Sequence, residues 1–113
     1  MKHKAFCCLL LASAAVSIPV AGHTEELETV RLTIKDNRFE PSAIEVPTGK
    51  KFKLVIANEG DEEEEFDSAD LNREVLVRGH QQGEALIGPL NPGQYRFIGE
   101  NDPDTARGVI IAK

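Results

Sequence analysis

The sequence predicts an all-β domain, folded as a β-sandwich or barrel, and three observations lead to that prediction. Short segments alternate apolar and polar residues with a period of two, as Val30, Leu32 and Ile34 do within residues 30–34. Turn signals rich in Gly, Pro and Asn separate these segments. No stretch beyond residue 22 shows convincing helical periodicity. Short strands between such turns are typical of sandwiches and barrels.

The first three predicted strands cover residues 30–34, 44–46 and 52–56. The second ends at a Pro-Thr-Gly turn signal over residues 47–49, and the third ends at Asn-Glu-Gly over residues 58–60. In the third strand, Phe, Leu and Ile alternate with lysines, which predicts one buried face and one solvated face.

The remaining strands follow an acidic run, Asp-Glu-Glu-Glu-Glu-Phe-Asp, over residues 61–67. Val75 and Val77 indicate one strand, and a polar, Gly-flanked turn separates it from the next. That strand covers residues 85–90 and ends at an Asn-Pro-Gly turn. Two final strands are predicted at residues 95–97 and 109–112.

The N-terminus indicates export. A short basic start precedes an apolar stretch over residues 5–20 that is too short to be a stable transmembrane helix. We expect a cleavable signal peptide over residues 1–22, a flexible tail over residues 23–28 and one domain over residues 29–113. The first choice of cleavage site is the bond before His23, and the alternative is the bond one residue earlier, before Gly22. The protein is then periplasmic, with no direct membrane insertion.

Loss of the signal peptide changes the composition of the chain. Without Lys2 and Lys4, 11 basic residues face 19 acidic ones in 91 residues, so the net charge is −8. This charge argues against nucleic acid and anionic membranes as partners and favours a cation. Cys7 and Cys8 leave with the signal peptide, so no disulfide is expected and the fold depends on its core.

Four segments of the predicted domain resemble the cupredoxin-like domains in residues, order and spacing. They are the Lys-Asp-Asn-Arg-Phe-Glu-Pro and Ile-Glu-Val-Pro-Thr-Gly segments within residues 35–49, the Leu-Asn-Pro-Gly-Gln-Tyr-Arg-Phe segment at 90–97, and Gly-Val-Ile-Ile at 108–111. The resemblance covers nearly all of the mature chain. It implies a cupredoxin-like Greek-key β-sandwich of about seven to eight strands.

The copper ligands of that family are absent. The resemblance places a histidine near Glu64 and, after Phe97, a cysteine, a histidine and a methionine at Gly99, Asp102 and Arg107. A blue-copper site needs a thiolate and two imidazoles, and carboxylates do not replace them. The sequence therefore predicts no type-1 copper and no electron transfer through it.

Other segments resemble one branch of the family, which is associated with bacterial high-affinity iron permeases and their periplasmic iron-binding partners. These segments are Glu-Phe-Asp-Ser at 65–68, Leu-Asn-Arg-Glu at 71–74, Phe-Ile-Gly-Glu at 97–100 and Pro-Asp-Thr-Ala-Arg-Gly at 103–108. The resemblance implies an iron or copper ion as ligand, and a membrane iron permease and a periplasmic iron-binding protein as partners. Members of this branch commonly carry a histidine where this chain has Asp102, which argues against a site that depends on that histidine.

The cupredoxin architecture brings the loop after the third strand and the loop before the last strand to one end of the sandwich. Glu64 or Glu65 could then approach Glu100 and Asp102 and form an open carboxylate site, in which Glu65 and Glu100 are the favoured metal ligands. Hard oxygen ligands of this kind suit Fe(III), Mn(II) and Ca(II). The alternatives are a structural ion-pair network with Arg73, which the resemblance places near Glu65 and Glu100, and a solvated acidic face.

Four other residues have less specific interpretations. We expect Glu62 and Glu63 to solvate a loop, where they could also steer cations. His80 is read as a surface histidine. His23 would pair its imidazole with the new N-terminal amine, a chelating pair for Cu(II) that is the less favoured interpretation.

The sequence leaves three functions open. In the favoured one, the protein is a non-catalytic periplasmic component that binds iron or copper and exchanges it with a permease system. In the second, it is a copper-dependent ferroxidase for Fe(II), which needs a redox-active copper site that the chain does not evidently offer. In the third, it is a metal-free interaction module that kept the fold.

Overall fold

A computed structural model describes residues 13–15 and 26–113 of the chain. The predicted cleavage site before His23 and nearly all of the predicted signal peptide lie outside the described residues, as do residues 23–25 of the predicted tail. The described residues contain no helix, and so no helix with the length and hydropathy needed to span a membrane.

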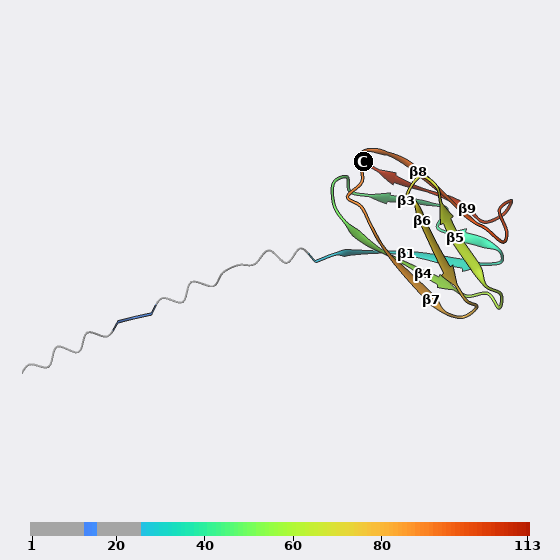
Figure 1. Cartoon of the computed structure of the whole chain (residues 1–113), viewed down its shortest axis with the longest axis horizontal. Coiled ribbons are helices and arrows are strands. Elements are labelled where there is room, and N and C mark those ends of the chain that lie inside the picture. Colours follow the sequence, from blue (N-terminus) through green and yellow to red (C-terminus); the bar gives the residue numbers. More distant parts are fainter. Residues whose placement is uncertain (1–12, 16–25) are drawn as a thin grey trace, which may run out of the picture.

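The domain consists of β-strands that form two sheets (Figure 1). The strands are β1 (Glu28–Lys35), β2 (Arg38–Glu40), β3 (Ala43–Val46), β4 (Phe52–Asn58), β5 (Glu64–Ser68), β6 (Arg73–Val77), β7 (Gln82–Ile87), β8 (Gly93–Gly99) and β9 (Arg107–Ala112). The first sheet has the order β2-β1-β4-β7 and the second β3-β9-β8-β5-β6. This confirms the predicted all-β sandwich, with nine strands in the described chain instead of seven to eight.

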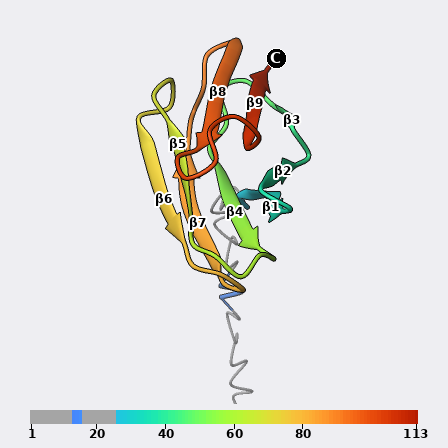
Figure 2. The ribbon, with the colours of Figure 1, turned by 90° about the vertical axis from the view of Figure 1, so that its right-hand side faces the viewer.

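Both sheets are mixed. The pairs β1–β4 and β3–β9 are parallel, whereas the other neighbouring strands are antiparallel. The sheets pack through their inward-facing apolar residues, as the alternating burial of β3 and β4 shows. β5 and β6 are antiparallel neighbours and lie side by side (Figure 2). This arrangement puts β5, with its carboxylates, between β6 and β8 in the five-stranded sheet.

Two strands were not predicted from the sequence. β2 is only three residues long and has one buried side chain, Phe39. β5 lies in the acidic run, and its inward positions are occupied by Glu64, Phe66 and Ser68. Because two of these three residues are polar, the usual apolar alternation is hidden. β1 also begins at Glu28, the last residue of the predicted tail.

An aromatic cluster anchors the core beneath β5. The ring centroids of Phe66 and Phe97 are 5.0 Å apart, and Phe39 contacts both rings edge-on, at 6.1 and 5.1 Å. All three side chains are buried. Edge-to-face and offset pairs of this kind stabilise a core beyond their area burial. Because Phe66 is fixed here, Glu64 shares its inward face and Glu65 lies on the outward face.

Candidate metal site between Glu64 and Asp102

The structure divides the four predicted carboxylates into two pairs. Glu64 is buried on the inward face of β5 and interacts with Asp102 of the β8–β9 loop. Glu65, next in sequence, interacts with Glu100 on the other side of the strand. The period of a β-strand separates consecutive side chains in this way. The predicted approach of the two acidic loops is therefore found, but as two pairs and not as one cluster.

Glu64 is held in place by backbone groups. Its Oε1 accepts hydrogen bonds from the backbone N–H of Glu65 and of Asn101, both at 3.0 Å. Gly99 leaves room for the carboxylate, because a Cβ at that position would lie 2.7 Å from Glu64 Cδ. Burial raises the pKa of Glu64, the two backbone N–H groups oppose that rise, and Asp102 adds to it. A charged Glu64 is thus disfavoured unless a cation lies nearby.

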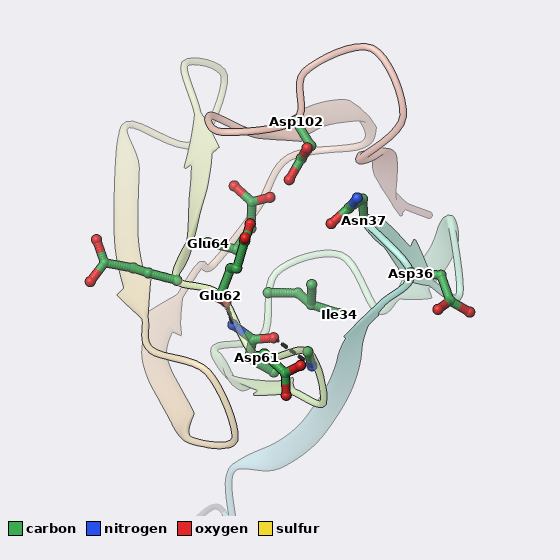
Figure 3. Close-up of a pocket in the computed structure, with 10 residues that line it drawn as sticks. Ile34, Asp36, Asn37, Asp61, Glu62, Glu64 and Asp102 are labelled. Carbon is green, nitrogen blue, oxygen red and sulfur yellow. Dashed lines mark hydrogen bonds between the residues drawn. The ribbon is translucent and has the colours of Figure 1, made fainter.

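A pocket of about 350 Å³ opens beside Glu64. Figure 3 shows the side chains of Glu64, Asp102 and Asn37 pointing toward one another across it, whereas Asp36 points away. The complete lining consists of Ile34, Asp36, Asn37, Asn58, Gly60, Asp61, Glu62, Glu63, Glu64 and Asp102. Most of these residues offer carboxylate or amide oxygens. The pocket is therefore suited to a cation and not to an apolar ligand.

The walls of the pocket depend on two asparagines that the sequence analysis did not single out as site residues. Asn58 is buried, and its Nδ2 donates to the carbonyls of Glu62 and Val77, at 2.8 and 3.0 Å. Its Oδ1 accepts from Gly60 N at 2.9 Å. Asn101 Nδ2 donates to the carbonyl of Glu63 at 2.9 Å. Asn101 thus ties the β8–β9 loop to the acidic β4–β5 loop, and Asn58 ties that acidic loop to β6.

Asn37 reaches the pocket because of the turn between β1 and β2. Asp36 and Asn37 both have positive φ, at 52° and 57°. Two consecutive residues with positive φ form the type I′ turn that suits a two-residue hairpin, and Asn and Asp adopt it readily. An Asp-Asn pair between two short strands was the available sequence signal for this hairpin.

The outer pair is also in contact. The backbone N–H of Glu100 donates to the carbonyl of Glu65 at 2.9 Å, which brings the two side chains together. The pKa of Glu65 is raised from 4.5 to about 6. The largest cause is a side-chain hydrogen bond with Glu100, and burial and nearby carboxylates contribute the rest. These two residues do not line the Glu64–Asp102 pocket. The structure thus gives no common ligand set for all four carboxylates.

The alternative ion-pair network with Arg73 is not found among the described residues. Antiparallel pairing of β5 with β6 places Leu76 opposite Glu65 and Arg73 opposite Ser68, at the far end of β5. The Arg73 guanidinium donates instead to the carbonyls of Asn72 and Leu86, at 3.2 and 3.3 Å. In the described chain, the ion pairs are Lys53–Glu84, His80–Asp61 and Lys113–Glu45, and none involves the predicted site carboxylates.

Glu62, Glu63 and His80 are surface residues, as expected. Glu62 and Glu63 are exposed at the rim of the pocket. His80 Nε2 lies 2.6 Å from Asp61 Oδ1, and both side chains are mostly exposed. This contact joins the β6–β7 turn to the loop that carries the acidic run. His80 does not line the pocket.

The donor set decides which metals fit. Among residues 13–15 and 26–113, no group of three or more His, Cys, Asp or Glu side chains is placed to hold a metal ion. Glu64 and Asp102 offer carboxylates and Asn37 offers an amide oxygen. With no thiolate or imidazole in the pocket, type-1 copper does not fit. The carboxylate and amide oxygens present are of the kind that hard cations prefer, with water in the other coordination positions.

Comparison with known proteins gives one curated relative of high similarity. The uncharacterized protein RP394 of Rickettsia prowazekii (strain Madrid E) is 45% identical over 82 residues, which are 73% of this chain and 66% of that protein. The chain thus spans just under two thirds of the length of this relative.

Solved structures share the fold at low identity. Auracyanin A, a "blue" copper protein from Chloroflexus aurantiacus, has a TM-score of 0.68 at 12% identity and covers 78% of this chain and 100% of its own. A heme-copper terminal oxidase has a TM-score of 0.64 at 17% identity and covers 76% and 65%. A Cu(I) form of an amicyanin variant gives 0.62 at 15% identity and covers 75% and 82%.

At such identities the likeness shows the fold alone. The sequence profile of the cupredoxin-like domain matches residues 5–112, which is nearly the whole chain. The two-sheet architecture and the solved structures agree with that match. The chain belongs to the cupredoxin-like domain family.

Proposed function

We propose that this cupredoxin-like domain binds a hard metal cation between Glu64 and Asp102 and exchanges it, without catalysis, as a periplasmic component of an iron-uptake system. One observation supports this most directly. Buried Glu64 occupies a position where the resemblance to copper-binding cupredoxins implies a ligand, and it faces Asp102 across a pocket of oxygen donors.

The electrostatics of the pocket favour a cation. Burial and the neighbouring Asp102 carboxyl both raise the pKa of Glu64, so two negative charges are unfavourable there without a counter-charge. A bound cation would stabilise both charged carboxylates. The exposed Glu62 and Glu63 at the rim would attract cations to the opening.

The small number of protein ligands favours exchange over storage. Glu64 Oε1 is already engaged by two backbone N–H groups, so this side chain offers chiefly its second oxygen. The remaining coordination positions would be filled by water or by ligands of a partner. The iron permease and the periplasmic iron-binding protein that the resemblance implies are the partners we propose.

Calorimetric titration tests this function. The exported, processed protein would be titrated with anaerobic Fe(II), and with Fe(III) citrate, Mn(II) and Cu(II). We expect Glu64→Gln and Asp102→Asn each to weaken binding of the preferred cation by about tenfold or more, since each removes a charged ligand, at about 1.4 kcal/mol per factor of ten.

The matched control is Glu45→Gln, which removes an exposed carboxylate that pairs with Lys113. It should bind like the wild type. Unchanged affinity in both site variants would overturn the assignment.

The second candidate function is the metal-free interaction module. It is favoured by the absence of a three-residue ligand group in the described chain, and it predicts no binding of any of the four ions.

A separate prediction concerns the outer pair. Glu65→Gln is expected to raise Tm relative to the wild type at pH 7.5 and to lose that advantage at pH 4.5. The folded protein raises the pKa of Glu65 from 4.5 to about 6, so it binds the proton more tightly than the unfolded chain does. Wild-type stability therefore falls as pH rises through this window. Scanning calorimetry at both pH values measures the difference.

Glu40→Gln is the control for this measurement, because Glu40 is exposed on β2 in the other sheet. Its effect on Tm should be the same at both pH values. If the Tm difference between Glu65→Gln and the wild type does not depend on pH, the raised pKa of Glu65 is contradicted.

A further inference from the structure

The outward face of β5, β6 and β8 has an apolar residue at its edge that the fold does not bury. Leu76 of β6 is 54% exposed, the largest value among the exposed large apolar side chains of the described chain. Its cross-strand neighbour on this face is Glu65. Ile98 of β8, half-buried, lies opposite Asp67 on the same face. Exposed apolar side chains framed by charge are typical of interaction surfaces.

A groove of about 260 Å³, lined mostly by apolar atoms, opens on this face between β5 and β8. The two strands pair only at Phe66–Gly99 and Asp67–Ile98. Beyond these pairs, hydrogen bonds from side chains to the backbone take the place of backbone–backbone hydrogen bonds between the strands. Ser68 Oγ donates to the carbonyl of Arg96 at 2.7 Å. Asp70 Oδ2 accepts from the backbone N–H of Arg96 at 2.8 Å. The strands separate there, and the groove forms over Ala69, Phe97 and Ile98.

Carboxylates outnumber arginines around the groove: Asp67 and Asp70 line it together with Arg96, and Arg107 lies opposite Ile98. Three carboxylates lie near Glu65, because strand register places Glu74 opposite Asp67 and the backbone N–H of Glu100 donates to the carbonyl of Glu65 at 2.9 Å. None of them takes part in an ion pair within residues 13–15 and 26–113. A partner with positive charge would therefore meet complementary charge over this face.

We propose that the outward face of β5, β6 and β8 is a docking surface for a basic segment of another protein. An apolar side chain of the partner packs against Leu76 or enters the groove beside Ile98, and Lys or Arg side chains flanking it meet the carboxylates. Apolar burial supplies affinity, whereas the charges speed association and select the partner. The surface does not depend on the proposed metal function, because Glu64 and Asp102 lie on the inward side of β5.

An NMR titration with defined peptides tests this surface. The ¹⁵N-labelled protein would be titrated with an acetylated, amidated Lys-Leu-Lys-Leu-Lys peptide in metal-free buffer. Two comparison peptides carry charge alone, Lys-Gly-Lys-Gly-Lys, or apolar side chains with the wrong charge, Glu-Leu-Glu-Leu-Glu. We expect amide shifts at Glu65, Leu76 and Ile98 with the first peptide, weaker binding of the second, none of the third, and a loss of affinity with added salt.

The chain offers a matched pair of variants. Leu76→Lys is expected to weaken peptide binding by about tenfold, because it removes apolar contact and adds a like charge. Leu86→Lys makes the same change at a leucine of similar exposure on β7, in the other sheet, and should leave binding unchanged. Both leucines are exposed, so both variants should fold.

Three outcomes would overturn the proposal. In the first, the peptide shifts the resonances of the pocket residues Asn37 and Glu62 and not those of the outward face. In the second, Leu76→Lys and Leu86→Lys have the same effect. In the third, the resonances of this face shift with protein concentration in the absence of peptide, which would identify a second copy of the chain as the occupant.

Discussion

Mn(II), present at about one hundred times its dissociation constant, is expected to raise the free energy of unfolding by about 2.7 kcal/mol. The rise follows from binding to the folded state only, because Glu64 and Asp102 come from segments that the fold brings together. Glu64→Gln, with binding weakened about tenfold or more, should reduce this rise to about 1.4 kcal/mol or below. Urea denaturation with Mn(II), and with a chelator in its place, measures both quantities.

The same variant should be more stable than the wild type in the chelator. The glutamine oxygen can still accept from the backbone N–H groups of Glu65 and Asn101, and its amide can donate to Asp102. Substitution thus removes the negative charge of Glu64, which burial and Asp102 make unfavourable, and keeps the hydrogen bonds. Glu45→Gln should respond to Mn(II) like the wild type. A full Mn(II) effect in Glu64→Gln would show that the cation binds elsewhere.

Asn58→Ala is expected to destabilise the domain by about 3 kcal/mol in urea denaturation. Asn58 is buried and makes three hydrogen bonds, two to the carbonyls of Glu62 and Val77 and one from Gly60 N. Alanine leaves buried backbone groups without partners, which costs about 1–3 kcal/mol for each such group. The loop that carries Glu62 would also lose its attachment to β6.

Asn101→Ala is the comparison for this prediction. Its side chain is exposed and makes one hydrogen bond, to the carbonyl of Glu63. Because water can replace that partner, we expect a loss of at most about 1 kcal/mol. Equal losses in the two variants would contradict the structural role assigned to Asn58.

Seven of the nine strands follow from the alternation of apolar residues and from turn signals. The two missed strands show where that approach fails. β2 is too short to display a period, and β5 has Glu64 and Ser68 at inward positions. A polar inward residue is stabilised by partners that the fold supplies, such as the backbone N–H of Asn101 and the carbonyl of Arg96. Periodicity alone does not reveal such partners.

The site was predictable in part. The sequence favoured Glu65 and Glu100 as metal ligands and named Glu64 and Asp102 as further candidates, whereas the pocket of the structure is lined by Glu64 and Asp102. Asn58 was predicted only as a turn residue, because its contacts with Val77 span nineteen positions of sequence. The ion pair with Arg73 failed because it required a register of β5 against β6 that the sequence does not determine. Hydrogen bonds and pairings between distant segments thus account for the errors.

The register of β5 has a consequence for engineering and for divergence of this fold. Glu64 and Glu65 are consecutive, so an insertion of one residue between Glu65 and Phe66 would turn Glu65 inward and Glu64 outward while Phe66 stays in the core. In the unaltered chain, Phe66 resists a one-residue slip of β5, because a slip would turn its ring away from Phe39 and Phe97 and out of the core. One aromatic side chain thereby keeps the two acidic pairs apart, and a change at Phe66 would alter the inner pocket and the outward face at once.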